Sequence, residues 1–245
     1  MTKNGDDPER ACELECRGLQ GLPGRREFVG PVKIVLIEST PLDYRRKVCW
    51  SALLALAFIF LGVPAFTVLV YTTLFKLPLR VNLHIVLSTI GTQLLSIPAI
   101  LMISPFFGGG MLLNRRNRNF QHFLLQISGL ICGMTSFGLM AQNLQCSFHG
   151  LTGIFGVVFA LFASFFGPGV YHSSTGGFCG RIHRKAHVLF GLFSFLNSTA
   201  CFFCAFLETK VLDWIEIQFH AVVLMIMIFF YTLCVLGSIF IKSND

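Results

Sequence analysis

The sequence predicts an all-α membrane protein with six transmembrane helices, because it is very apolar and its apolar residues are grouped in six long runs. Of its 245 residues, 54% are hydrophobic and only 13% are charged, and the mean hydropathy is +0.70. Charged residues make up about a quarter of an ordinary soluble domain. Each run exceeds the ~20 residues that cross a hydrocarbon core as a helix. The runs cover roughly 48–75, 82–107, 120–142, 149–171, 186–207 and 217–241.

Two features divide the chain. No charged residue lies between Arg118 and Arg181, a segment too long for one span, and a polar turn at 142–145 separates it into two runs. The N-terminal residues mix charges with Gly and Pro and are expected to be flexible, with residues 28–37 as a candidate short strand or surface element. The predicted parts are a cytosolic tail, a six-helix transmembrane domain and a short cytosolic C-terminus, at residues 1–47, 48–241 and 242–245.

The basic residues of the loops predict the orientation. They gather between the second and third runs and between the fourth and fifth, whereas Lys76 and Arg80 alone argue for the other side. Because cytosolic loops are enriched in Lys and Arg, both termini are predicted to be cytosolic. The net charge of +7 is explained by this topology, and nucleic-acid binding is not expected. The basic loop residues are Arg115, Arg116, Arg118, Arg181, Arg184 and Lys185.

A histidine opens each of four consecutive runs, the second to the fifth: His84, His122, His149 and His187. Residues at i+4 and i+7 share the histidine's face of a helix. Seven of these eight residues are Gly or Ser and the eighth is Gln126, in helices otherwise rich in Leu, Ile and Phe. A cleared strip beside each imidazole predicts room for a flat ligand. The eight residues are Ser88, Gly91, Gln126, Gly129, Gly153, Gly156, Gly191 and Ser194.

Connectivity sorts the four histidines into two layers. The second and fourth helices run inward from the non-cytosolic face, so His84 and His149 share that leaflet. The third and fifth run the opposite way, so His122 and His187 share the cytosolic leaflet. About 13–15 residues at ~1.5 Å each would place the layers roughly 20 Å apart. Transmembrane histidines are costly and usually have a partner or a function, although one at a helix end can simply be solvated.

Two histidines per layer suit heme better than zinc. A structural zinc site needs four ligands, and no Cys or carboxylate is predicted at matching depth. Two trans imidazoles complete the axial positions of heme iron, and the small residues leave space for the macrocycle inside a helix bundle. The second to fifth helices are therefore predicted to form a four-helix di-heme core. His172, His183 and His220 are interpreted as non-ligands, and Cys201 and Cys204 as packing thiols.

These residues together resemble the cytochrome b-561 family of six-helix transmembrane reductases, and most closely its branch of cytochrome b-561 domain-containing proteins. The resemblance covers about 84–207. It implies two heme b groups per chain, one ligated by the second and fourth helices and the other by the third and fifth. Its most specific parts are His84-Ile-Val-Leu-Ser88 running to Ser104-Pro105, His122-Phe-Leu-Leu-Gln126, His149-Gly150 with Gly153, and His187 with Gly191.

The resemblance also implies an ascorbate-dependent transmembrane reductase. A cytosolic donor, ascorbate, would pass electrons to a non-cytosolic acceptor, either ferric iron in a chelate or the monodehydroascorbate radical. Two departures stand out: Leu83 and Ile85 flank His84 where the family commonly has Trp and Pro, and residues 104–110 replace the basic, aromatic donor motif of ascorbate-using members. Ascorbate is thus implied by the family alone. A homodimer is compatible with this interpretation, and the endoplasmic reticulum, a vesicle and the plasma membrane all remain open.

The basic residues beside the third and fifth helices are candidate donor-binding groups. Arg116 and Arg118 precede His122, and the other three precede His187, so all are expected above one heme edge. Guanidinium groups there would attract and orient an anionic donor. The alternative is that they only fix the topology. The remaining three are Arg181, Arg184 and Lys185.

Two other functions compete with electron transfer. One is a proton-coupled transporter without heme that uses the histidines as a proton relay. No acidic residue lies inside any predicted span, and no pair of helices is broken by Gly or Pro at matching depth, as binding sites of repeat-built transporters often are. The other is a structural protein whose cofactor is vestigial. An absorption spectrum separates the three.

Overall fold

The computed structural model describes the predicted transmembrane domain and little of the chain before it. The predicted flexible tail up to residue 40, the candidate strand at 28–37 and the C-terminal residues 242–245 lie outside the described part. Residues 1–46 and 47–245 form separate units, and the description below concerns the second. The described residues are 41–104, 106–111, 113–143, 147–172, 178–208, 211, 215 and 218–240.

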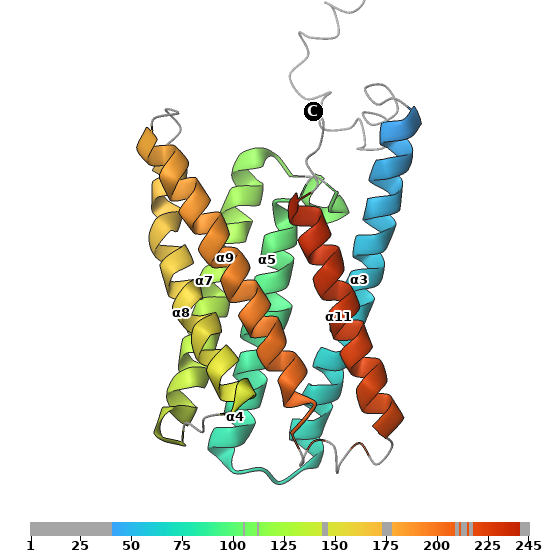
Figure 1. The fold of residues 1–245 in the computed structure, drawn as a ribbon, viewed down its shortest axis with the longest axis vertical. Helices are drawn as coiled ribbons and strands as arrows, with labels where there is room; N and C mark the ends of the chain where they lie inside the picture. Colours follow the sequence, from blue (N-terminus) through green and yellow to red (C-terminus); the bar gives the residue numbers. More distant parts are fainter. Residues whose placement is uncertain are drawn as a thin grey trace, which may run out of the picture. The chain divides into compact units, whose positions relative to one another are not determined.

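The predicted fold class is confirmed: in the part of the chain that the structure describes, six helices are long and apolar enough to cross a membrane. Helices suit this environment because they satisfy their own backbone hydrogen bonds, for which lipid offers no partner. The second span, Leu79–Met102, is built from three consecutive helical segments. The helices are α3 (Pro41–Leu74), α4 (Leu79–Ser88), the π-helix η2 (Thr89–Leu95), α5 (Ser96–Met102), α6 (Gly108–Met111), α7 (Arg115–Met140), the 3-10 turn η3 (Ala141–Asn143), α8 (Phe148–His172), α9 (Phe178–Ala205) and α11 (Gln218–Phe240) (Figure 1).

Three helices begin well before the apolar runs that predicted them. The last residues of the predicted tail belong to α3, and α7 and α9 start several residues before their apolar parts. The Asn114 side chain caps α7, since its Oδ1 accepts the backbone N–H of Asn117 at 2.8 Å. The arginines expected in loops are therefore in the first turns of helices, where their side chains remain accessible to water. The polar turn at 142–145 is confirmed at its start by η3.

Four of the spans form two antiparallel pairs. Helix α7 packs along α4, η2 and α5, and α8 packs along α9. Helices α3 and α11 add a hydrophobic cluster with α5 and α9, in which Phe60 and Phe230 meet edge to face at 4.9 Å between ring centroids. One polar contact crosses this cluster: the buried Tyr231 hydroxyl donates to Oε1 of the buried Gln93 at 2.6 Å.

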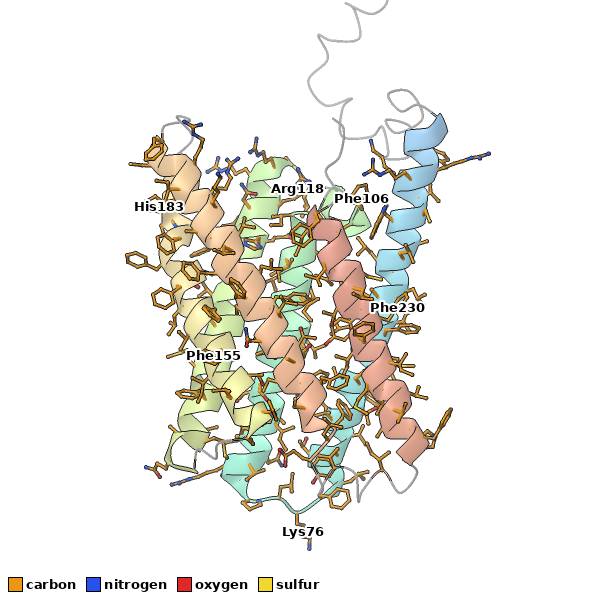
Figure 2. All side chains as sticks on the ribbon, in the orientation of Figure 1. Lys76, Phe106, Arg118, Phe155, His183 and Phe230 are labelled. Atoms are coloured by element: carbon orange, nitrogen blue, oxygen red, sulfur yellow. The ribbon has the colours of Figure 1, made fainter. Side chains whose placement is uncertain are left out.

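The two ends of the bundle differ in charge. Helices α7 and α9 begin at the same end, where Figure 2 shows Arg118 and His183, and Lys76 lies at the opposite end. We call the first the basic end. Helices α4 and α8 begin at the opposite end (Figure 1). Histidines near the starts of α4 and α8 therefore share one level, and those near the starts of α7 and α9 share the other.

With six spans, both ends of the transmembrane domain should lie on one side of the membrane, and the arginines of the basic end should make that side cytosolic. A protease-cleavable tag fused to either terminus should be cut by added protease in sealed vesicles whose cytosolic face is outward. In vesicles of the opposite orientation the tag should be protected. A cleaved N-terminal tag beside a protected C-terminal tag would mean an odd number of spans.

Candidate functional site: two pairs of transmembrane histidines

The four histidines stand within the first turns of the apolar parts of four helices. His84 lies in α4, His122 in α7, His149 in α8 and His187 in α9. The start of α8 is fixed by Ser147, whose hydroxyl accepts a backbone N–H of the first turn at 3.1 Å. This cap places His149 in the first turn of α8, at the level where α4 also begins.

The histidines meet in the two pairs that connectivity predicts. The ring centroids of His84 and His149 are 6.2 Å apart, with the ring planes at 83°. Those of His122 and His187 are 6.1 Å apart, at 79°. All four side chains are partly buried. Each pair joins one helix of the α4–α7 pair to one helix of the α8–α9 pair.

The tautomer of each histidine is set by the neighbouring helix. Every Nδ1 lies within hydrogen-bond distance of a backbone carbonyl, and because a carbonyl can only accept, Nδ1 must carry the proton. The Nε2 lone pair is then left for a metal, the arrangement typical of metal-binding histidines. The distances are 3.1 Å from His84 to Ser136, 2.8 Å from His122 to Ala99, 3.0 Å from His149 to Cys201 and 2.8 Å from His187 to Ala163.

These bonds are reciprocal within each helix pair, and they set the distance between the two levels. Each span carries one histidine and one carbonyl that accepts the Nδ1–H of the histidine on the paired helix. The number of residues between the two is nearly the same in all four spans. Roughly 14 residues at ~1.5 Å per residue put the two levels about 21 Å apart. The interval is identical from His122 to Ser136, from His187 to Cys201 and from His149 to Ala163, and it is longer by a single position from His84 to Ala99.

The longer interval contains the π-helix η2. A π turn holds one residue more than an α turn, so it absorbs an extra residue without rotating the flanking helix. An extra residue in a regular α-helix would turn the Ala99 carbonyl by about 100° away from His122. The π-helix thus restores the geometry that α8 reaches with the shorter interval. The apolar pattern of this span did not predict it.

A cavity of about 170 Å³ lies between His122 and His187. Its walls come from the second span and from α7, α8 and α9, with Ile239 of α11. Small residues make the space, and Gly133 and Gly191 have open space where a side chain would begin. Of the eight small or amide residues singled out in the sequence, those that line this cavity are Gln126, Gly129, Gly156, Gly191 and Ser194.

Several of the same residues also let the paired helices approach. A Cβ on Gly91 would lie 2.8 Å from the Gly129 carbonyl oxygen, and one on Gly156 would lie 2.7 Å from Ser198 Oγ. The Ser194 hydroxyl donates to the Gly156 carbonyl at 2.9 Å. The cleared strips therefore serve helix packing as well as the cavity. Gln126 makes an interhelical hydrogen bond, donating from Nε2 to the Ser96 carbonyl at 3.2 Å.

The candidate donor-binding residues all lie at the basic end, in the first turns of α7 and α9. Arg118 is half-buried and packs beside Gly110, where a Cβ would be 3.6 Å from the arginine Cδ. His183 packs edge-on against Phe166, with ring centroids 5.7 Å apart, and is not part of either histidine pair. The exposed members of the group are Arg116, Arg181, Arg184 and Lys185.

The comparison with known protein families matches residues 83–213 to the family described as eukaryotic cytochrome b561. The match covers more than half of the chain and includes all four paired histidines. The chain belongs to the cytochrome b561 family. No curated protein and no solved structure matches it. Membership implies a transmembrane oxidoreductase that transfers electrons by means of heme, and cytochromes b561 generally bind heme b.

The histidine pairs of this cytochrome b561 fit a heme iron. A metal–imidazole bond of about 2 Å on each side, plus about 1 Å from each nitrogen to its ring centre, puts two trans imidazole centroids about 6 Å apart. The observed separations are 6.2 and 6.1 Å. Both Nε2 atoms of each pair are free to coordinate, because Nδ1 is held by a carbonyl.

The carbonyl-bearing residues were missed at the sequence level. Ala99, Ser136, Ala163 and Cys201 have no side-chain pattern in common, because the bond is made by the backbone. Their signal is a spacing: each follows the histidine of its own span by nearly the same interval. Cys201 contacts His149 through both its carbonyl and its Sγ, so the expectation that no Cys lies at the depth of a histidine pair is wrong.

The role of the π-helix predicts opposite outcomes for two deletions. Deleting Leu94 from η2 should let the segment close as a regular α-helix with the interval of the other three spans, so heme content and thermal stability should change little. Deleting Val158, at the exposed middle of α8, should turn Ala163 about 100° away from His187 and lose heme. The measurement is heme absorbance per chain in the purified variants. Equal heme loss in both would mean that the π-helix does not compensate for the extra residue.

Proposed function

We propose that this cytochrome b561 carries electrons across the membrane through two b hemes, from a cytosolic donor, ascorbate, to a non-cytosolic acceptor such as a ferric chelate or monodehydroascorbate. His84 and His149 would hold one heme, and His122 and His187 the other. The proposal rests on one observation above all: two imidazole pairs at two levels, each with the centroid spacing of trans ligands on one metal.

Bound heme supplies a one-electron couple between ferric and ferrous iron. The residues of this chain determine how that couple is held. The carbonyl bonds hold each imidazole in one tautomer and aim its Nε2 atom. With both histidines of a pair holding the heme, donor and acceptor would bind at the faces of the bundle.

The basic end is the proposed donor face. The starts of α7 and α9 carry the five candidate cations, at the end of the bundle nearer to His122 and His187. Converging guanidinium groups would concentrate an anionic enediol donor and fix its orientation. The opposite end, beyond His84 and His149, is the proposed acceptor face.

Each heme should depend on its own pair of histidines. The wild-type protein should show a low-spin heme spectrum equivalent to two hemes per chain. Alanine at His84 or at His149 should remove one spectral component, and alanine at His122 or at His187 should remove the other, because the pairs share no ligand. The measurement is the absorbance spectrum of each of the four single variants, followed during a redox titration.

Electron transfer across the membrane is measured with the same variants in vesicles. Vesicles loaded with ascorbate should reduce an external ferric chelate when they contain the wild-type protein, and either class of histidine variant should abolish this. His183→Ala is the matched control, since His183 belongs to neither pair, and it should keep both components. If the wild-type protein contains no heme, the proposal is wrong. If His84→Ala and His122→Ala deplete the same spectral component, the pairing of the histidines is wrong.

If ascorbate binds at the donor face, replacing arginine by lysine there should slow reduction even though the charge is kept. Lysine keeps the topological signal of arginine but lacks the planar fork that grips an enediolate through two bonds. The double variant Arg116→Lys with Arg181→Lys should therefore slow reduction by ascorbate several-fold, while heme content and orientation stay normal. Stopped-flow absorbance is the measurement.

Dithionite, which needs no shaped site, should reduce this double variant at the wild-type rate. Arg80→Lys, at the opposite end, is the matched variant and should leave ascorbate reduction unchanged. If ascorbate reduction is as fast in the double variant as in the wild type, these arginines act as topological signals only and the donor binds elsewhere.

A further inference from the structure

The two histidine pairs differ in what surrounds Nδ1. At His84, the neighbouring residue Ser136 contributes its side chain as well as its carbonyl: Ser136 Oγ lies 2.9 Å from Nδ1, and the carbonyl oxygen lies 3.1 Å from it. The Ser136 hydroxyl donates its own proton to the His84 carbonyl at 3.0 Å. An oxygen lone pair therefore faces Nδ1, and the Nδ1 proton is shared between two acceptors.

His149 has the same arrangement with sulfur in place of oxygen. Cys201 Sγ lies 3.4 Å from Nδ1, beside the Cys201 carbonyl oxygen at 3.0 Å. The thiol donates to the His149 carbonyl at 3.3 Å. Gly153 makes room for it, since a Cβ there would lie 3.2 Å from the sulfur. Ser136 and Cys201 each follow their histidine by 52 residues, so they occupy equivalent places in the two helix pairs.

Among the residues that the structure describes, no such group lies at the other histidine pair. The carbonyls that accept from His122 and His187 belong to Ala99 and Ala163, whose methyl groups can neither donate nor accept. The second acceptor at Nδ1 is thus a property of the His84/His149 level.

A second acceptor changes the electronic character of the ligand. Hydrogen bonding at Nδ1–H pushes electron density into the ring and makes Nε2 a more basic ligand. A more basic ligand stabilises the more positive, oxidised iron and lowers the reduction potential. A thiol sulfur accepts a hydrogen bond more weakly than a hydroxyl oxygen, so Ser136 should act more strongly than Cys201.

We propose that Ser136 and Cys201 are positioning residues that lower the reduction potential of the heme held by His84 and His149, below the value that the backbone carbonyls alone would give. This inference rests on the proposed function, because it requires a heme at that level. It gives the two levels different potentials although all four ligands are histidines bonded to carbonyls.

The test is a redox titration of the purified holoprotein in which the two spectral components are resolved. The component lost in His84→Ala identifies the level. In Ser136→Ala, reduction of that component should become easier by about threefold in equilibrium constant, or about 28 mV for a one-electron couple. The largest g value of this component in the electron paramagnetic resonance spectrum of the low-spin ferric protein should shift together with its potential. The potential and g value of the other component should not change.

Isosteric exchanges separate hydrogen bonding from packing. Ser136→Cys should raise the potential of this component by less than Ser136→Ala does, whereas Cys201→Ser should lower it below the wild-type value. Neither exchange removes the side-chain atom at this position, as alanine does. The potential should therefore follow the order Ser, Cys, Ala at both positions, from low to high.

Ala99→Ser and Ala163→Ser are the matched variants at the other level, where they add a hydroxyl at the equivalent place. They should lower the potential of the second component and leave the first unchanged. Two resolved components in the wild type that do not move in Ser136→Ala or in Cys201→Ser would overturn the inference and leave the proposed function intact. Absence of heme from the wild type would instead overturn the proposed function.

Discussion

The hydrogen bond from histidine Nδ1 to a carbonyl of the neighbouring helix is the constraint on which the site depends. It fixes the tautomer, aims Nε2 and satisfies a polar group that lipid would leave unpaired. Because each helix of a pair both gives and receives one such bond, the two helices cannot slide past each other by a residue without losing both. Depth in the membrane, ring orientation and helix register are thus set by the same contact.

Close helix packing follows from that constraint. A carbonyl on one helix can reach an imidazole on the next only if the backbones come close, and glycine permits this where Gly91 meets Gly129 and where Gly156 meets Ser198. The same residues, lacking side chains, also open the cavity between His122 and His187. A small residue on a histidine's face therefore cannot be assigned to the cofactor or to packing from its identity alone.

The sequence predicted the parts of the structure that depend on side-chain chemistry. Apolar length predicted the six spans, and chain direction predicted the two levels of histidines, because alternate helices must run in opposite directions. The π-helix could not be read from the apolar pattern, since both α and π windings bury the same residue types. The acceptors of the histidine bonds were also hidden, because Ala99 and Ala163 act through backbone atoms that every residue has. The roles of Ser136 and Cys201 needed distances.

The same bonds argue against a proton relay as the purpose of these histidines. A relay passes a proton in at one ring nitrogen and out at the other, so both nitrogens need partners that can exchange protons. Here Nδ1 of every paired histidine faces a carbonyl oxygen, which accepts a hydrogen bond but does not carry a proton onward. The Ser136 hydroxyl and the Cys201 thiol, which also face Nδ1 at His84 and His149, donate their own protons to backbone carbonyls. The rings also form two separate pairs about 21 Å apart in depth instead of a continuous chain. A fixed neutral tautomer is a disadvantage for moving protons and an advantage for holding a metal through Nε2, so the geometry favours an electron carrier.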